Sequence, residues 1–357
     1  MDAPSPPVKE AEKSTVASRS SECVGLARIC VGLVMLGTAV FATAAAIVFL
    51  VPEQNDYNLG IELKHHRLAE FDTRKIVLVG GSNLSYGVDS KLLQKATGCP
   101  VVNMGMNGYF GVRYMLEEVR REINPADIVV LSFEYDNLFK SVDGSPASHL
   151  AIIKARPAVL SYLSFSQKLE VIAAIPTVAQ TKIIRLIGEL ITSVKEPIAG
   201  KSYHSDPSID LNIIESLKSF TPEGDIVGHL GAVWPFDREA AVVPEGATVD
   251  PEMITLMQAF AAEMQMRGVP VIVSYTPFMR EAYEELEGDL AQFDAMIRSS
   301  PPLTVPSSPS SFVFDQSLFF DTVYHLNERG RTLRTQKLAD DLIATLGARA
   351  RCPQETR

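Results

Sequence analysis

The sequence predicts an α/β fold with a doubly wound parallel sheet, because short apolar strands alternate with amphipathic helices over most of its length. The expected strands are almost uninterrupted apolar runs, as buried parallel strands are, and they cover residues 75–79, 101–104, 127–133 and 269–275. The expected helices separate or follow them, at residues 89–97, 112–123, 253–266 and 328–346. A chain of 357 residues can bury an ample core around such a sheet.

Local signals support each of these helices. Asp89 precedes the first as a capping residue, and Gly98 ends it. The second has one apolar face with helical spacing, formed by Val112, Met115, Leu116, Val119 and Ile123. Gly268 ends the third helix, and Asn327 stands where it could cap the last one.

The N-terminal region carries a candidate membrane anchor. Residues 29–51 contain no charged side chain and are long enough to cross a bilayer as a slightly tilted helix. Cations precede this run, at Lys9, Lys13, Arg19 and Arg28, so the positive-inside rule predicts a cytoplasmic N-terminus and an exported remainder. A cleavable signal peptide is the alternative, but the run exceeds the usual length of roughly 7–15 residues, which favours an uncleaved anchor.

These signals divide the chain into four parts. We expect a disordered cytoplasmic tail, a transmembrane signal anchor, a polar linker and an α/β domain, at residues 1–22, 23–51, 52–72 and 73–350. The alternation stops at about 140–250, which predicts an insertion. Within it, an apolar helical stripe between Ile183 and Val194 is most simply a helix packed on the core. A lid, or a helix that lies on the membrane, is the other interpretation.

Composition and motifs exclude several classes of function. The net charge of −10 argues against a general nucleic-acid binder. The dinucleotide fingerprint G-x-G-x-x-G is absent, and no histidine or cysteine spacing matches a zinc site, so no cofactor or metal is expected. Cys99 and Cys352 both lie in the exported part, where a disulfide is permitted, although two free thiols fit the sequence equally well.

Polar side chains stand near the ends of the predicted sheet. The first strand runs into Gly80, Gly81 and Ser82, and open α/β sheets bind ligands at the carboxyl ends of their strands. A serine there needs a base, and His325 follows Asp321 by four residues just before the last helix. We therefore expect Ser82 as nucleophile, His325 as general base and Asp321 as its orienting carboxylate. A histidine that only bonds the helix end is the alternative.

Two further polar clusters follow the second and third strands. Residues 103–108 include Gly108, whose backbone amide could face the same crevice, and residues 134–137 end in Asn137. An oxyanion hole made of the amides of Ser82 and Gly108 and the side chain of Asn137 would stabilise the charge of an acyl-transfer intermediate.

The order of these clusters resembles that of the SGNH, or GDSL-like, hydrolase superfamily. That family carries its nucleophile in a Gly-Asp-Ser block, and here Gly81 replaces the aspartate before Ser82. Gly108 matches the glycine of the second block. Asp321 and His325 match the final D-x-x-H block with one extra intervening residue. The third block, G-x-N-D in the family, departs furthest, because Asp136 stands where its asparagine is expected and Asn137 comes one place later.

The resemblance implies a flavodoxin-like three-layer fold and attack by serine on an acyl ester. The family includes carbohydrate acetylesterases and membrane-tethered relatives that acylate exported polysaccharides, such as the alginate O-acetylation proteins. We therefore expect a membrane-anchored, extracytoplasmic esterase or O-acyltransferase that acts on acylated carbohydrate of the cell envelope, with polysaccharide-assembly machinery as partner. A non-catalytic assembly or glycan-binding protein on a degenerate fold is the alternative, and a phosphate-binding α/β domain ranks third.

Overall fold

The computed structural model describes residues 8–139, 141–195, 211–214, 216–232 and 249–352. The chain forms two compact units. The sheet unit comprises Glu53–Ile172 and Ile198–Arg357, and the N-terminal unit comprises Met1–Pro52 and Ala173–Pro197.

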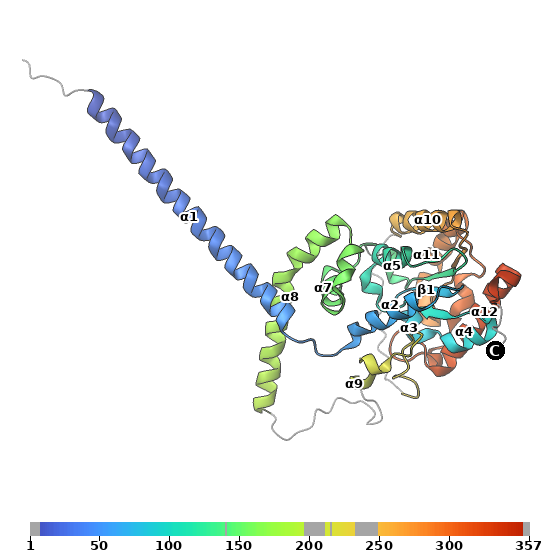
Figure 1. Cartoon of the computed structure of the whole chain (residues 1–357). Helices are drawn as coiled ribbons and strands as arrows, with labels where there is room; N and C mark the ends of the chain where they lie inside the picture. The colour runs from blue at the N-terminus through green and yellow to red at the C-terminus, as the bar shows by residue number, and fades with distance from the viewer. Residues whose placement is uncertain (1–7, 140, 196–210, 215, 233–248, 353–357) are drawn as a thin grey trace, which may run out of the picture. The chain divides into compact units, whose positions relative to one another are not determined.

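The sheet unit is built on a four-stranded parallel sheet with the order β2-β1-β3-β4. Figure 1 labels its first strand, β1, and most of the helices. Its strands are β1 (Ile76–Gly80), β2 (Val101–Asn103), β3 (Ile128–Ser132) and β4 (Val271–Val273). The chain passes from β1 to β2 on one side and then returns to β3 on the other, so the strand order reverses between β1 and β3. A crevice opens at such a switch point. The predicted parallel α/β sheet is therefore confirmed.

Helices connect and cover these strands. Those of the sheet unit, with their short 3-10 turns, are η1 (Tyr57–Leu59), α2 (Gly60–Glu70), α3 (Ser82–Gly87), α4 (Ser90–Thr97), η2 (Gly108–Phe110), α5 (Val112–Arg120), α6 (Asp136–Phe139), α7 (Pro146–Ala155), η3 (Pro157–Ser161), α9 (Leu211–Ile214), η4 (Leu217–Ser219), α10 (Pro251–Met266), α11 (Arg280–Arg298), η6 (Pro309–Phe312), η7 (Gln316–Leu318), α12 (Glu328–Leu346) and η8 (Gly347–Ala350). A second, two-stranded parallel pair joins β5 (Phe278–Met279) to β6 (Val313–Phe314).

The capping signals read from the sequence operate as expected. The side chain of Asp89 accepts a hydrogen bond from the amide of Leu92, and Gly98 ends α4 with a left-handed φ of 74°. The side chain of Asn327 accepts from the amide of Gly330 at the start of α12. Each cap satisfies a backbone group that the helix itself leaves unpaired.

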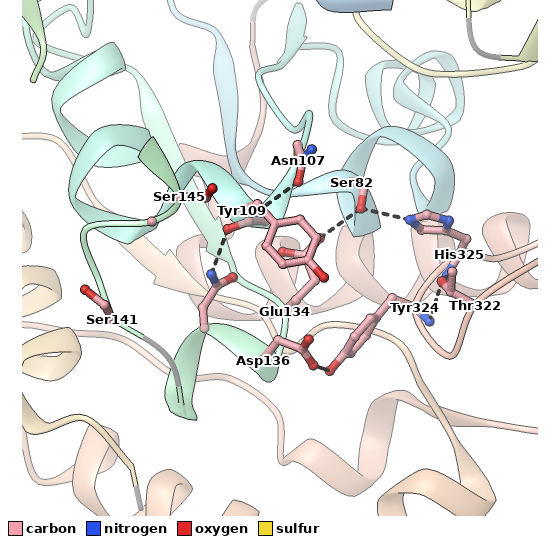
Figure 2. A pocket seen from close by; sticks show the side chains of 13 residues that line it. Ser82, Asn107, Tyr109, Glu134, Asp136, Ser141, Ser145, Thr322, Tyr324 and His325 are labelled. Carbon is pink, nitrogen blue, oxygen red and sulfur yellow. Dashed lines mark hydrogen bonds between the residues drawn. The ribbon is translucent and has the colours of Figure 1, made fainter. Parts of the chain in front are cut away.

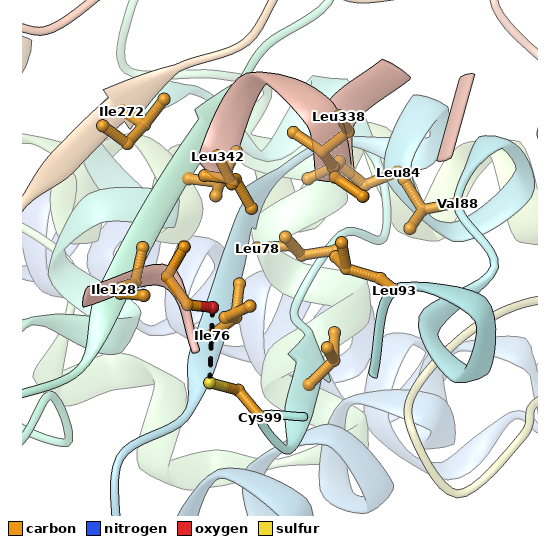
Figure 3. Packing of buried hydrophobic residues seen from close by; sticks show 14 residues of the cluster. Ile76, Leu78, Leu84, Val88, Leu93, Cys99, Ile128, Ile272, Leu338 and Leu342 are labelled. Carbon is orange, nitrogen blue, oxygen red and sulfur yellow. Dashed lines mark hydrogen bonds between the residues drawn. The ribbon is translucent and has the colours of Figure 1, made fainter. Parts of the chain in front are cut away.

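The main core lies between one face of the sheet and helices α4 and α12 (Figure 3). Ile76 and Leu78 alternate on this face of β1, next to Ile128 of β3, and pack with Leu93 and Leu338 from the helices. All five side chains are buried. Burial of a side chain of this size stabilises the fold by roughly 1.5–3 kcal/mol, so this layer fixes α12, whose N-terminal end follows His325.

A disulfide joins Cys99, just before β2, to Cys352, just after η8, and the two are 253 positions apart in the sequence. The two Cα atoms are 4.8 Å apart. Of the two states that the sequence allowed for these cysteines, the structure shows the paired one. Cys99 is fully buried beside the core cluster, so the bond ties the end of the described chain to the sheet.

The segment 52–72, predicted as a polar linker, is instead largely structured. Helix α2 occupies most of it and buries Ile61, Lys64, His65 and Leu68 on one face. These positions have the helical spacing i, i+3, i+4, i+7. Because two of the four residues, Lys64 and His65, are polar, the apolar residues alone do not show the helical spacing.

A buried polar network holds α2 against the end of β2. The ammonium of Lys64 donates to the carbonyl oxygens of Asn103 and Gly224, at 2.8 and 2.5 Å. Burial lowers the pKa of Lys64 to about 7, and the nearby carboxylate of Asp225 opposes that shift. Asp225 in turn accepts from the Asn103 side chain and from Arg331, each at 2.8 Å. The network therefore fixes the residue from which the 103–108 cluster begins.

The N-terminal unit contains helix α1 (Val8–Leu50). Its segment Gly25–Leu50 is long and apolar enough to cross a membrane. Residues 1–7 of the predicted disordered tail lie outside the described residues, but residues 8–22 continue the helix rather than forming a disordered tail. Extending an existing helix by one residue fixes one residue for each new hydrogen bond and avoids the unfavourable nucleation step.

Helix α8 (Phe165–Lys195) begins in the sheet unit, and its residues from Ala173 onward belong to the N-terminal unit. The simpler interpretation of its stripe, an ordinary helix packed on the core, is wrong. Ile183, Ile187 and Leu190 are 40%, 50% and 65% exposed. The described remainder of the insertion contains helices α7 and α9 and the turns η3 and η4, and residues 196–210 and 233–248 lie outside the described part.

Candidate active site

Ser82 lies where β1 ends and helix α3 begins. The chain approaches its neighbours closely at the two preceding glycines. A Cβ atom at Gly80 would clash with the carbonyl oxygen of Ser132, and one at Gly81 would clash with the carboxyl group of Glu134. Only glycine fits at these positions, and the sharp turn presents the Ser82 hydroxyl at the sheet edge.

The structure brings Ser82, His325 and Asp321 together. Nε2 of His325 lies 2.8 Å from Oγ of Ser82, and Nδ1 lies 2.7 Å from Oδ1 of Asp321 (Figure 2 shows the serine contact). Ser82 and His325 are 243 positions apart in the sequence. An imidazole that bonds a hydroxyl with one nitrogen and a carboxylate with the other has the arrangement of a general base oriented for one tautomer.

The loop that carries His325 is held on several sides. Its backbone carbonyl accepts from the amide of Phe320 at 2.8 Å, and its amide donates to the hydroxyl of Thr322 at 3.2 Å. The next residue, Leu326, accepts a hydrogen bond from the ring of His229 at 3.0 Å. Burial lowers the pKa of His229 to about 4, so this ring is neutral at physiological pH and donates through Nε2.

The other two residues expected in the oxyanion hole, Gly108 and Asn137, line the same cavity as Ser82. Within the described part of the chain, the backbone amides of Ser82 and Gly108 donate to no other protein group. Asn137 donates from Nδ2 to the carbonyl oxygen of Gly108 at 2.8 Å, which fixes the peptide at Gly108. Two such amides in one cavity could donate hydrogen bonds to an oxygen atom of a ligand.

Sequence reasoning missed the side chain closest to this group, Glu134. Its Oε1 accepts from the amide of Asn83 at 2.8 Å and lies 3.3 Å from Oγ of Ser82. Its Oε2 is buried and has no hydrogen-bond partner among the described residues. The Ser82 hydroxyl has one proton and cannot donate to His325 and Glu134 at once. The pairing of Gly80 with Ser132 places residues 82 and 134 at matching positions beyond the strands, and only that register could have revealed the contact.

A buried arginine lies beneath these residues. Arg334 of α12 donates to the side-chain oxygen of Asn83 at 2.8 Å and to the hydroxyl of Ser132 at 2.9 Å. Burial lowers the pKa of Arg334 to about 9, and the charge of Glu134 opposes that shift. The guanidinium therefore remains charged at neutral pH and holds Asn83, the residue that follows Ser82.

The cavity in front of Ser82 has a volume of about 280 Å³ (Figure 2). This is the lower end of the size range of small-molecule sites. Hydroxyl, amide and carboxyl groups line it, from Asn107, Tyr109, Asp136, Ser141, Ser145 and Tyr324. Burial, with a further contribution from Asp136, raises the pKa of Tyr324, whose hydroxyl donates to that carboxylate at 2.8 Å. The cavity thus has the size of a small-molecule site and offers several hydrogen-bonding groups beside Ser82.

No protein-family model matches the chain, and no curated protein matches it. Among solved structures, it is similar to an acetyl xylan esterase from the rumen bacterium Butyrivibrio proteoclasticus, at a TM-score of 0.30 and 11% sequence identity. That match covers 77% of this chain and 64% of the esterase, so the chain spans less than two thirds of the length of that structure. A likeness this weak does not assign a function, which has to be argued from the site itself.

Proposed function

We propose that this protein is a serine esterase or O-acyltransferase. The observation that carries the proposal is the contact of His325 with Ser82 at 2.8 Å and with Asp321 at 2.7 Å. A serine hydroxyl is a weak nucleophile unless a base takes its proton, and this geometry supplies both the base and the group that orients it.

In the proposed reaction, Oγ of Ser82 attacks the carbonyl carbon of an ester while Nε2 of His325 takes the hydroxyl proton. Asp321 stabilises the resulting imidazolium. The amides of Ser82 and Gly108 bind the oxyanion, and Asn137 contributes by holding Gly108. The imidazolium then returns the proton to the leaving alcohol, which leaves an acyl-serine. Water or an acceptor hydroxyl then attacks the acyl-serine while the same imidazole takes its proton. The imidazolium returns that proton to Oγ of Ser82 as the acyl group leaves.

The substrate we infer is a small acyl ester on a carbohydrate. The cavity of about 280 Å³ with its hydroxyl and amide lining supports a short acyl group beside a polar alcohol. An exported position, anchored through residues 29–51, would direct the enzyme to cell-envelope or exported polysaccharide and to the machinery that assembles it. We also propose that helices cover both faces of the sheet, which would give the three-layer flavodoxin-like arrangement.

The direct test is labelling by a serine-reactive fluorophosphonate. The full-length protein should be labelled at Ser82, and Ser82→Ala should abolish labelling. Ser141→Ala is the matched control, because Ser141 lines the same cavity without contacting His325; it should be labelled normally. An unlabelled wild-type protein, beside a reactive control esterase, would refute the proposal.

Glu134 favours a second candidate function, a glycan-binding protein on a degenerate hydrolase fold. Its carboxyl oxygens add negative charge next to the place where an oxyanion would form, which opposes catalysis. On that alternative, Ser82→Ala would bind acetylated oligosaccharides as tightly as wild type, and a Ser82→Ala strain would retain the envelope acylation that deletion abolishes.

A further inference from the structure

Helix α8 exposes an apolar face to its surroundings. This face comprises Ile183, Ile184, Ile187, Leu190 and Ile191, which are between 40% and 65% exposed. The positions recur at intervals of three and four residues, so they lie along one side of the helix. Contiguous exposed aliphatic side chains of this kind mark a surface that contacts another apolar phase.

A transmembrane role for α8 conflicts with the fold of the sheet unit. By length and composition, Phe165–Ile191 could cross a bilayer. A single crossing there would place β3, which precedes α8, and β4, which follows it, on opposite sides of the membrane. Yet β3 and β4 pair in one sheet, with Val129 opposite Val271. Between α8 and β4 the sequence has no uncharged run near the ~20 residues that a return crossing needs. Helix α8 therefore stays on one side.

Contacts within the N-terminal unit place α8 at the end of the α1 span. The ammonium of Lys182 donates to the carbonyl of Val51, and the guanidinium of Arg185 donates to the carbonyl of Pro52, each at 3.5 Å. Val51 and Pro52 directly follow Leu50, where the apolar segment of α1 ends. If α1 is inserted, these carbonyls lie at the membrane surface, and α8 is held at the same level.

The polar side chains of this part of α8 lie away from the apolar face. Lys182 is 7% exposed and lies roughly opposite Ile187 on the helix. Arg185 pairs with Glu189 at 3.6 Å on the same side as Lys182. A helix with one aliphatic face and one charged face binds in the plane of the membrane surface, with the aliphatic side chains in the acyl boundary.

We propose that α8 lies in the plane of the membrane surface and that lipid acyl chains cover its apolar face. The chain then has two attachments to one leaflet, the end of the α1 span and the α8 face. The inference rests on membrane insertion of α1 and is independent of the chemistry proposed for Ser82.

The test uses the full-length protein in lipid nanodiscs, with Cys23→Ser and Cys30→Ser to remove the thiols outside the Cys99–Cys352 disulfide. Single cysteines at Ile187 and Leu190 report on the apolar face, and Thr181→Cys is the matched control, because Thr181 is exposed on another side of α8. Each is labelled with a nitroxide, and collisions with oxygen, which concentrates in lipid, are compared with collisions with a water-soluble nickel chelate.

We expect the labels at 187 and 190 to collide several-fold more with oxygen than with nickel, and the label at 181 to show the opposite ratio. Nickel accessibility at 187 and 190 equal to that at 181 would refute the proposal. Protection of both labels from both reagents would also refute it, because protein rather than lipid would then cover the face. Fluorophosphonate labelling of Ser82 in the same samples reports separately on the catalytic proposal.

Discussion

The imidazole of His325 stacks face to face on the ring of Tyr86, with the centroids 4.0 Å apart and an interplanar angle of 8°. Tyr86 belongs to α3, the helix that begins at Ser82. Ser82 and the ring that supports His325 thus come from one short helix. Because α3 sets both, the orientation of the imidazole relative to the hydroxyl depends on Tyr86.

We predict that Tyr86→Ala lowers kcat for a short-chain aryl ester by about tenfold, since an aromatic pair contributes roughly 0.5–1.5 kcal/mol beyond its buried area. Tyr86→Phe keeps the ring and should remain within about threefold of wild type. Steady-state kinetics, with circular dichroism to verify folding, measure both. Equal losses in the two variants would show that the hydroxyl matters and the stack does not.

Glu134 gives a charge-specific prediction. Glu134→Gln removes a negative charge next to the oxyanion position, keeps an acceptor for the amide of Asn83 and adds a donor. We expect it to match or exceed the wild-type kcat. Glu134→Ala leaves the buried amide of Asn83 without a partner, so it should reduce stability by about 1–3 kcal/mol and activity with it. A large loss of activity in a stable Gln variant would show that the carboxylate itself takes part in the reaction.

His229 should make the loop that carries His325 sensitive to acid. Its folded pKa of about 4 lies below the ordinary 6.5, so between these values the unfolded chain binds more protons than the native one. The stabilisation is complete above pH 6.5 and is lost as the pH falls towards 4, an effect on the order of 3 kcal/mol. Urea unfolding at several pH values measures the slope. His229→Gln can still donate to Leu326, and it should lose the part of the slope that His229 contributes between pH 4 and 6.5. An unchanged slope would contradict the assignment.

The disulfide should contribute strongly to stability. Bonds that close long loops typically stabilise by about 2–5 kcal/mol, and this one closes a loop across 253 positions. The paired variant Cys99→Ser with Cys352→Ser should lower the urea midpoint, and reductant should lower the wild-type midpoint similarly. Cys30→Ser, in an exposed position, is the control and should change neither. Equal midpoints with and without reductant would count against the bond.

Much of the sheet was predictable because its signals are local. Parallel strands buried on both faces need continuous apolar runs, and residues such as Asp89 and Asn327 mark helix starts whatever surrounds them. Expected and observed boundaries of the strands that carry the site therefore differ by only one or two residues.

Features that depend on partners distant in the sequence were not predictable. The sequence predicts a linker in place of α2 because a lysine gives no local sign of burial. Lys64 is buried only by its contacts with Asn103 and Gly224, which lie far along the chain. The contact of Glu134 with Ser82 was not predictable because it follows from the register of β1 and β3. The stripe on α8 has the right period for a core helix, and only the exposure of its side chains shows that it does not pack on the core.

The position of the Cys99–Cys352 bond has a consequence for proteolysis. Ser82 precedes Cys99, and His325 lies on the segment that leads to Cys352. One peptide bond cut anywhere between Cys99 and His325 would leave Ser82 and His325 in two fragments that the disulfide still joins. Such a nicked protein would migrate as one band without thiol and as two with it, and it would still carry both residues.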